Sequence, residues 1–166
     1  MENADLNYLC TIIGNLSGVP VRRYEGEQLV FFHSFVSLPK DPVMLYWEEI
    51  QKLRAPIGYY VTDGFRYYGV ISYENQKIVI GPTCQTGSSD QELRELAFRL
   101  DVAPEEMEDF IIGMKSIIRM PLESIMQILC AMNYVLTGQK LSLQDIVVFD
   151  HQQELLNKES VADKVA

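Results

Sequence analysis

Residues 56–82, PIGYYVTDGFRYYGVISYENQKIVIGP, constrain the fold more than any other part of the chain. Asp63-Gly64 separates two runs rich in tyrosine and valine, and an Asp-Gly pair in that position is typical of a two-residue hairpin turn. This loop length predicts that Tyr60 faces Tyr67 across the two strands. A second turn at Asn75-Gln76 adds another strand. The sequence therefore predicts a three-stranded antiparallel meander.

The predicted pairing leaves a shallow trough on one face of the meander. Gly58 and Gly69 face each other beside Tyr60 and Tyr67, so two side chains are missing there. A trough walled by tyrosines suits a ligand that is partly flat and partly polar. The alternative is that a helix packs close to the sheet over the glycines, because aromatic stripes usually belong to a core. The predicted ligand-lining residues are Gly58, Tyr60, Tyr67 and Gly69, with Phe65 and Trp47 as further candidates.

The segments before the meander complete the expected sheet. Apolar residues at helical spacing predict a helix over residues 3–16, which ends at Gly18. Residues 21–24 and 28–34 flank a short polar turn and predict a second hairpin. Asp41-Pro42 predicts the start of a helix that runs to about residue 53 and carries Trp47, which is alternatively a core anchor. The fold class is α+β, with a central antiparallel sheet of about five strands and flanking helices.

The carboxyl-terminal half is predicted to be mainly helical. Ser89 with Glu92 three residues later marks one helix start, and Pro104 marks a second. Pro121 opens the longest predicted helix, which ends at Gly138, and a short helix or strand follows near residues 145–149. The charged tail is typical of a linker. We expect one domain over residues 1–150 and a linker over residues 151–166 that leads toward a DNA-binding domain outside this chain.

Composition argues against several classes of function. The 166 residues include 14 basic and 23 acidic side chains, a net charge of −9, and the basic residues form no stripe that could neutralise DNA phosphates. The three cysteines include no Cys-x-x-Cys pair, which favours free thiols in a reducing cytoplasm. No apolar run reaches the length of a membrane span, and no secretory signal is recognisable.

Catalytic and metal-binding patterns are also missing from the sequence. His33 and His151 are far apart and have no cysteine or carboxylate at metal-ligand spacing. The carboxylates between residues 90 and 109 do not follow the spacing of a calcium loop, so capped, solvated helices explain them better. No nucleophile elbow, Walker A loop or glycine-rich dinucleotide motif occurs. We therefore expect no enzyme activity, no cofactor and no metal.

The order of elements resembles one class of regulatory domain. The aromatic meander ending in IVIGP, the acidic helical pair and the helix led by Pro121 are similar to the N-terminal sensory region of AraC-family transcriptional regulators from Gram-positive bacteria. The resemblance covers most of residues 3–150. It implies a PAS-, GAF- or profilin-like fold that receives a signal and forms dimers, and that precedes a DNA-binding domain.

The resemblance leads to a set of functional expectations. We expect a cytoplasmic homodimer that binds an unknown small-molecule effector and reaches DNA only through a domain not present in this chain. The alternative is a ligand-free dimerisation module, with contacts through the helix carrying Leu6, Leu9 and Ile13 or the helix carrying Ile125 and Met132. A small enzyme is the third and least favoured class.

Overall fold

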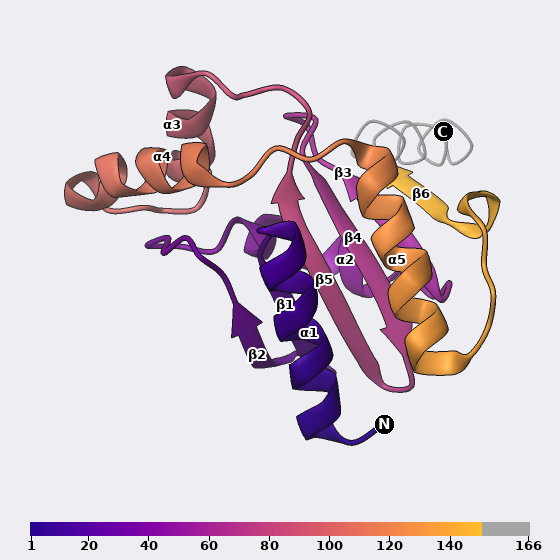
Figure 1. The fold of residues 1–166 in the computed structure, drawn as a ribbon. Helices are drawn as coiled ribbons and strands as arrows, with labels where there is room; N and C mark the ends of the chain where they lie inside the picture. The colour runs from indigo at the N-terminus through magenta and orange to yellow at the C-terminus, as the bar shows by residue number, and fades with distance from the viewer. Residues whose placement is uncertain (151–166) are drawn as a thin grey trace, which may run out of the picture.

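The computed structural model describes residues 1–150, and the predicted linker lies outside the described residues. Its centre is a six-stranded sheet in the order β2-β1-β5-β4-β3-β6 (Figure 1). The expected α+β class is confirmed, and strands β1 to β5 pair antiparallel. The sixth strand pairs parallel to β3. The strands are β1 (Val21–Glu25), β2 (Gln28–His33), β3 (Ile57–Val61), β4 (Tyr67–Tyr73), β5 (Gln76–Thr83) and β6 (Val147–Asp150).

Two long helices cover one face of the sheet. They are α1 (Asn3–Ser17) and α5 (Leu122–Thr137), and Figure 1 shows both on the same side of the strands. Both end as predicted, at Gly18 and Gly138, which adopt the left-handed conformation that glycine tolerates best. The helices bury apolar side chains against those of the strands, and this core includes Cys10, Ile78, Ile80, Ile125, Leu129 and Met132.

The opposite face of the sheet is covered by residues 42–51. Asp41 begins this segment as predicted, since its carboxylate accepts a hydrogen bond from the Val43 amide at 3.0 Å. The expected single helix is divided, however, into a 3-10 turn (Pro42–Leu45) and a short helix α2 (Trp47–Gln51). The break lets Tyr46 turn toward the sheet. Its ring packs against Tyr60 and Tyr68.

The register predicted for the first hairpin is wrong by one residue. Tyr60 pairs with Tyr68, not Tyr67, and Gly69 pairs with Tyr59. The loop has three residues, because the Thr62 amide donates to the Arg66 carbonyl at 2.8 Å and closes the turn outside Asp63-Gly64-Phe65. Phe65, and not Gly64, adopts the positive φ of 58°. A shift of one residue moves every following side chain to the other face of the sheet.

The second hairpin also differs from its predicted register, but by two residues. Ser72 pairs with Lys77 and Ile71 with Ile78, so the turn lies at Glu74-Asn75. A shift of two leaves each side chain on its predicted face. The strand also continues past its expected end at Pro82, because Thr83 still pairs with Tyr67.

The remaining two helices form a hairpin that projects from one end of the sheet (Figure 1). Helix α3 (Asp90–Arg99) begins at Ser89, whose hydroxyl accepts from the Glu92 amide at 3.2 Å as predicted. Helix α4 (Met107–Ser116) follows a 3-10 turn that starts at Pro104. The two helices have a hydrophobic core of their own. Its members are Leu93, Leu96, Ala97, Leu100, Val102, Phe110, Ile111, Met114 and Ile117.

The end of α3 allows a first stability prediction. Asp101 has a φ of 57° and follows the helix in a Schellman arrangement, in which the Val102 amide donates to the Ala97 carbonyl at 3.0 Å. Its negative charge also opposes the negative end of the helix dipole. We expect Asp101→Gly to raise the free energy of unfolding by about 1 kcal/mol, measured by urea denaturation. Asp101→Ala also removes the charge, but it places at the positive φ a residue that tolerates this conformation less well than aspartate or glycine does, so it should be less stabilising than Asp101→Gly. Equal stabilisation by the two variants would contradict a role for the backbone conformation.

Among residues 1–150, none of the helices is both long enough and apolar enough to cross a membrane.

Candidate functional site

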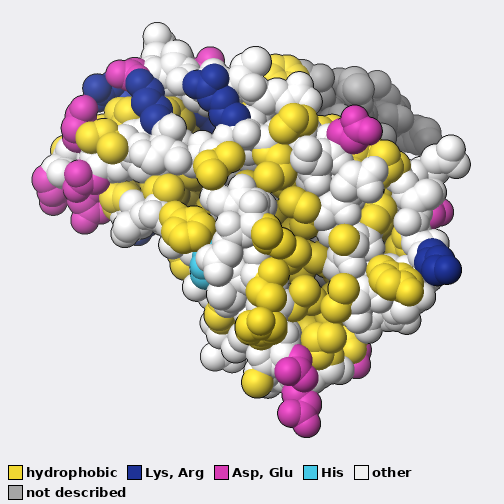
Figure 2. Space-filling model, in the orientation of Figure 1, with side chains coloured by type: hydrophobic (Ala, Val, Ile, Leu, Met, Phe, Trp, Pro, Cys, Tyr) yellow, Lys and Arg dark blue, Asp and Glu magenta, His cyan; other side chains and the backbone are white. Residues whose placement is uncertain are grey.

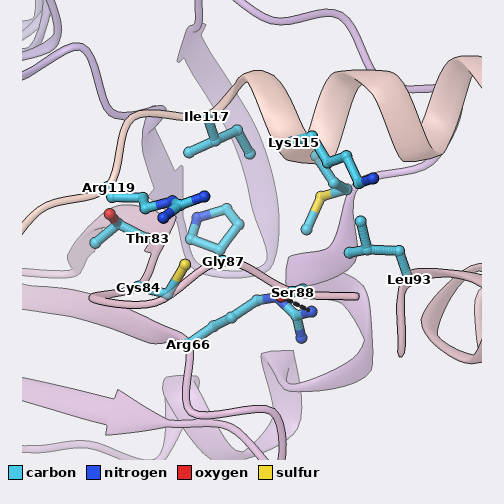
Figure 3. A pocket seen from close by; sticks show the side chains of 11 residues that line it. Arg66, Thr83, Cys84, Gly87, Ser88, Leu93, Lys115, Ile117 and Arg119 are labelled. Carbon is cyan, nitrogen blue, oxygen red and sulfur yellow. Dashed lines mark hydrogen bonds between the residues drawn. The ribbon is translucent and has the colours of Figure 1, made fainter. Parts of the chain in front are cut away.

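A partly enclosed cavity lies where the α3–α4 hairpin joins the sheet, and we call it the junction pocket. Its volume is about 260 Å³, which suits a small metabolite better than a peptide. Four parts of the chain form it: the start of β4, the end of β5 with the loop after it, the α3–α4 hairpin, and the segment from α4 to α5 (Figure 3). The lining residues are Arg66, Pro82, Thr83, Cys84, Gly87, Ser88, Leu93, Met114, Lys115, Ile117 and Arg119.

Arg66 is the most buried cation of the junction pocket. Only 7% of the residue is exposed, and one guanidinium nitrogen, Nη2, donates to the Ser88 hydroxyl at 2.6 Å (Figure 3). The other end of the guanidinium lies near Gly64, where an added Cβ would come within 2.5 Å of Nη1. Arg66 forms no salt bridge with any carboxylate of the described residues. Its charge is therefore held at the pocket wall by a neutral hydroxyl.

Arg119 reaches the junction pocket from the segment between α4 and α5. Its guanidinium lies over the backbone of Gly87, where an added Cβ would be 2.5 Å from Nη2 and 3.0 Å from Cζ. The absence of a side chain at Gly87 permits this close approach. Arg119, too, has no salt bridge with a residue of the described part of the chain. Figure 3 shows Arg66 and Arg119 approaching the pocket from different walls.

Lys115, the third cation, is paired at the rim. Its amino group donates a hydrogen bond to Asp90 at the start of α3, and this bond lowers the pKa of the Asp90 carboxyl. The pair joins α3 to α4 at the rim of the junction pocket. Because both side chains are about half exposed, solvent screens the pair.

The rest of the lining is apolar or weakly polar. Leu93 and Met114 come from the core of the α3–α4 hairpin, and Ile117 comes from the segment after it. The thiol of Cys84 is half-buried beside them. The pocket can therefore hold an apolar group against one wall while a polar group meets the arginines.

Thr83 ties the pocket wall to the start of α5. Its hydroxyl donates to the Ile118 carbonyl at 2.8 Å and accepts from the Met120 amide at 3.1 Å. The same amide lies 3.2 Å from the carbonyl oxygen of Cys84. The segment that carries Arg119 is thus anchored to β5 immediately before α5 begins.

The structure does not bring the sequence-predicted site residues together. Gly58 and Tyr60 belong to the face covered by α2, whereas Tyr67 and Gly69 belong to the face covered by α5. The predicted trough of paired glycines is therefore not formed. Tyr67 itself lies near Cys84, and burial raises the pKa of its phenol. None of the six predicted residues lines the junction pocket.

Both glycines are instead places where the chain packs closely. A Cβ on Gly69 would come within 2.9 Å of Leu129 and 3.1 Å of Ile125, so α5 lies directly on this strand position. A Cβ on Gly58 would come within 3.0 Å of the carbonyl oxygen of Val147 on β6. The alternative considered for the glycines, close packing of a helix, is confirmed at Gly69, whereas the close neighbour of Gly58 is strand β6.

The two further candidates also lie apart. Phe65 is exposed at the tip of the first hairpin, beside a shallow hollow that contains the 2.7 Å salt bridge between Arg99 and Asp63. Trp47 is half-buried on α2 and stacks on Tyr24, with 4.0 Å between the ring centroids. This contact supports the core-anchor alternative for Trp47.

The described residues contain no group of three or more His, Cys, Asp or Glu side chains suited to a metal ion. The buried Nδ1 of His33 has no hydrogen-bond partner within residues 1–150 and faces Gly14 of α1. His151 lies outside the described residues. The cation-bearing positions of the junction pocket were missed by the sequence analysis because they come from separate segments and share no spacing.

Comparisons with protein-family models, curated proteins and solved structures find no match to this chain.

Proposed function

We propose that this chain is the ligand-sensing domain of a bacterial transcription regulator, and that its effector binds in the junction pocket. The observation that carries the proposal is the position of the pocket: the segment with Ile117 and Arg119 lines the cavity and then leads directly into α5. A ligand held by this segment changes the free energy of one arrangement of α5 relative to others. A ligand shifts such an equilibrium only if it binds one arrangement more tightly than the others.

The path from the pocket to the end of the described chain is short and consists of packed elements. Leu129 of α5 lies on Gly69 of β4, and the chain then returns as β6 along β3. In the proposal, a displacement at the start of α5 passes along these packed elements to β6, the last strand that the structure describes. The chain beyond β6 connects to a DNA-binding domain in this proposal, since the sequence shows no basic stripe that could neutralise the phosphates of DNA.

Hydrogen exchange tests the coupling between the pocket and α5. A panel of carboxylic acids, sugar phosphates, nucleotides and neutral sugars is first screened for compounds that raise the melting temperature. For the most stabilising compound, we expect slower amide exchange both at the pocket and in the first half of α5. Thr83→Val, which removes the hydroxyl bonds to residues 118 and 120, should reduce the effect on α5 more than the effect at the pocket, which Thr83 also lines. Thr11→Val, whose hydroxyl bonds within α1, is the control.

Two results would contradict this proposal. One is that no compound of the panel stabilises the protein. The other is that protection stays confined to the pocket and does not reach α5.

A ligand-free dimerisation module is the alternative function, and one observation favours it. Tyr8 and Leu16 of α1 and Tyr134 and Val135 of α5 are more than half exposed, and Figure 2 shows hydrophobic side chains spread over the face that carries these helices. The contact residues expected from the sequence are less suitable. Leu6, Ile125 and Met132 are fully buried in the chain's own core, and Leu9 and Ile13 are partly buried.

Sedimentation velocity separates the two functions. A dimer that Leu16→Glu dissociates, together with a failure of every compound to stabilise the protein, supports the dimerisation module. A compound that binds and alters α5 supports the sensing domain whether the chain is monomeric or dimeric.

A further inference from the structure

We infer that the effector is a small organic anion, in which a carboxylate or phosphate group contacts Arg66 and Arg119 and an apolar part contacts Leu93, Met114 and Ile117. That the bound anion acts as an effector rests on the proposed function, whereas the binding of an anion at this site can be tested separately. Carboxylate and phosphate share the chemistry that the two guanidinium groups recognise, and the experiment below distinguishes them.

The first argument is the burial of Arg66 without a salt bridge. An arginine residue that is only 7% exposed loses much of its hydration, and buried charges in proteins are normally paired. The buried Arg22 of this same chain follows that rule, with two hydrogen bonds of 2.6 and 2.8 Å to Asp41. Arg66, at the wall of the cavity, donates to a hydroxyl and has no salt bridge among the described residues, although Asp63, Glu92 and Glu95 lie around a second hollow that it also lines. An anion in the cavity would pair directly with its guanidinium.

The second argument is the composition of the lining. The chain has 23 acidic and 14 basic side chains, yet among the described residues the pocket is lined by three basic side chains and by no acidic one. One carboxylate, that of Asp90, lies at the rim, where it pairs with Lys115. A positive pocket in a chain of net charge −9 attracts anions to one place on an otherwise acidic protein.

The third argument concerns the shape of the ligand. Arg119 and Arg66 lie on separate walls, and Gly87 leaves room for the Arg119 guanidinium to turn toward the cavity (Figure 3). The apolar side chains line the part formed by the α3–α4 hairpin. A ligand with an anionic end and an apolar end therefore contacts both the sheet and the hairpin at once.

Four probes test the inference: benzoate, phenyl phosphate, inorganic phosphate and the neutral benzyl alcohol. Calorimetry at low ionic strength should show that benzoate or phenyl phosphate binds at least about tenfold more tightly than benzyl alcohol, because only the anions form charge-assisted hydrogen bonds. Inorganic phosphate should bind more weakly than phenyl phosphate, since it leaves the apolar wall uncovered. The ratio of the benzoate and phenyl phosphate affinities identifies the preferred anionic group.

Charge-removing variants locate the site. Arg119→Gln and Arg66→Gln should each weaken binding of the preferred anion about tenfold or more. Arg54→Gln is the matched control, because it removes the same charge near Lys77, at the opposite end of β5. Arg119 is exposed and its variant should fold normally, so the test does not depend on the buried Arg66.

Alkylation of Cys84 gives a second measurement on the unmodified chain. The preferred anion should slow the reaction of iodoacetamide with Cys84, which lines the pocket, and leave the reaction of Cys130 on α5 unchanged. Cys10 serves as the unreactive reference, because burial raises the pKa of its thiol to about 11.

The inference is overturned if benzyl alcohol binds as tightly as both organic anions, if none of the probes protects Cys84, or if Arg119→Gln and Arg54→Gln have equal affinities. Its failure is distinct from failure of the sensing function. An anion that binds here and leaves exchange in α5 unchanged contradicts the sensing function only. A neutral compound that protects both the pocket and α5 contradicts only the inference that the ligand is an anion.

Discussion

Replacing Asp41 by alanine is expected to lower the free energy of unfolding by about 3–5 kcal/mol, the cost of leaving a buried charge unpaired. Arg22 is 1% exposed and lies on β1, between the sheet and the segment that covers it. Its guanidinium donates to both oxygens of Asp41, and Nη1 donates to the Gly81 carbonyl at 2.5 Å. Loss of the carboxylate leaves the arginine with one neutral acceptor in an apolar environment. The same change removes the hydrogen bond that begins the 3-10 turn at Pro42.

Urea denaturation of two further variants tests the explanation. Glu25→Ala breaks the 3.2 Å salt bridge to Arg23, which also has Asn7 and Gln76 as partners, and should cost less than about 1 kcal/mol. The double variant Arg22→Met/Asp41→Leu should recover much of the stability lost in Asp41→Ala, because no unpaired charge remains. If the double variant is no more stable than Asp41→Ala, the unpaired charge of Arg22 is not the cause of the stability lost in Asp41→Ala.

Replacing Phe110 by alanine is expected to destabilise the α3–α4 hairpin by about 3–5 kcal/mol. Phe110 is fully buried in the core of the hairpin, which is separate from the two cores on the sheet. Since the side chains from outside the hairpin that pack against this core, Val36, Leu38 and Leu45, do not lie on strands, the damage should spare the sheet. Hydrogen exchange should become fast in residues 90–116 and stay slow in β3, β4 and β5.

The change should also abolish the junction pocket, because Leu93, Met114 and Lys115 are held by the hairpin. Binding of the preferred anion should fall below detection in calorimetry. Phe98→Ala is the matched control: the residue is on α3 but is 80% exposed, and the change should alter stability by less than about 0.5 kcal/mol. Uniformly faster exchange across the sheet in Phe110→Ala would contradict a separately stabilised hairpin.

Local signals accounted for most of the helix ends. Gly18 and Gly138 stop α1 and α5 where the sequence predicted, and Ser89 begins α3, since caps depend on residues within one turn. The division of the helix after Asp41 was not predicted. Tyr46 leaves the helical path to pack on two sheet tyrosines, and contacts of that range have no local signature.

The predicted trough depended on the register of the first hairpin, which is wrong by one residue. Asp63-Gly64 marks a turn correctly, but Phe65 adopts the positive φ and lengthens the loop to three residues. The resulting one-residue shift places Gly58 and Gly69 on opposite faces and removes the predicted trough. The junction pocket had no comparable signal, because Arg66, Ser88 and Arg119 come from three segments separated by more than 20 residues.

By itself, the sequence determined the α+β class, the antiparallel meander, the positions of the main helices and a net charge of −9. Those properties follow from residue periodicity, turn chemistry and charge, which act over a few neighbouring positions or simply add up. The tertiary structure alone decided the strand register, the parallel sixth strand and the gathering of Arg66, Lys115 and Arg119 around one cavity. Each of these depends on which distant side chains meet when the sheet and the hairpin pack, and no local pattern records that.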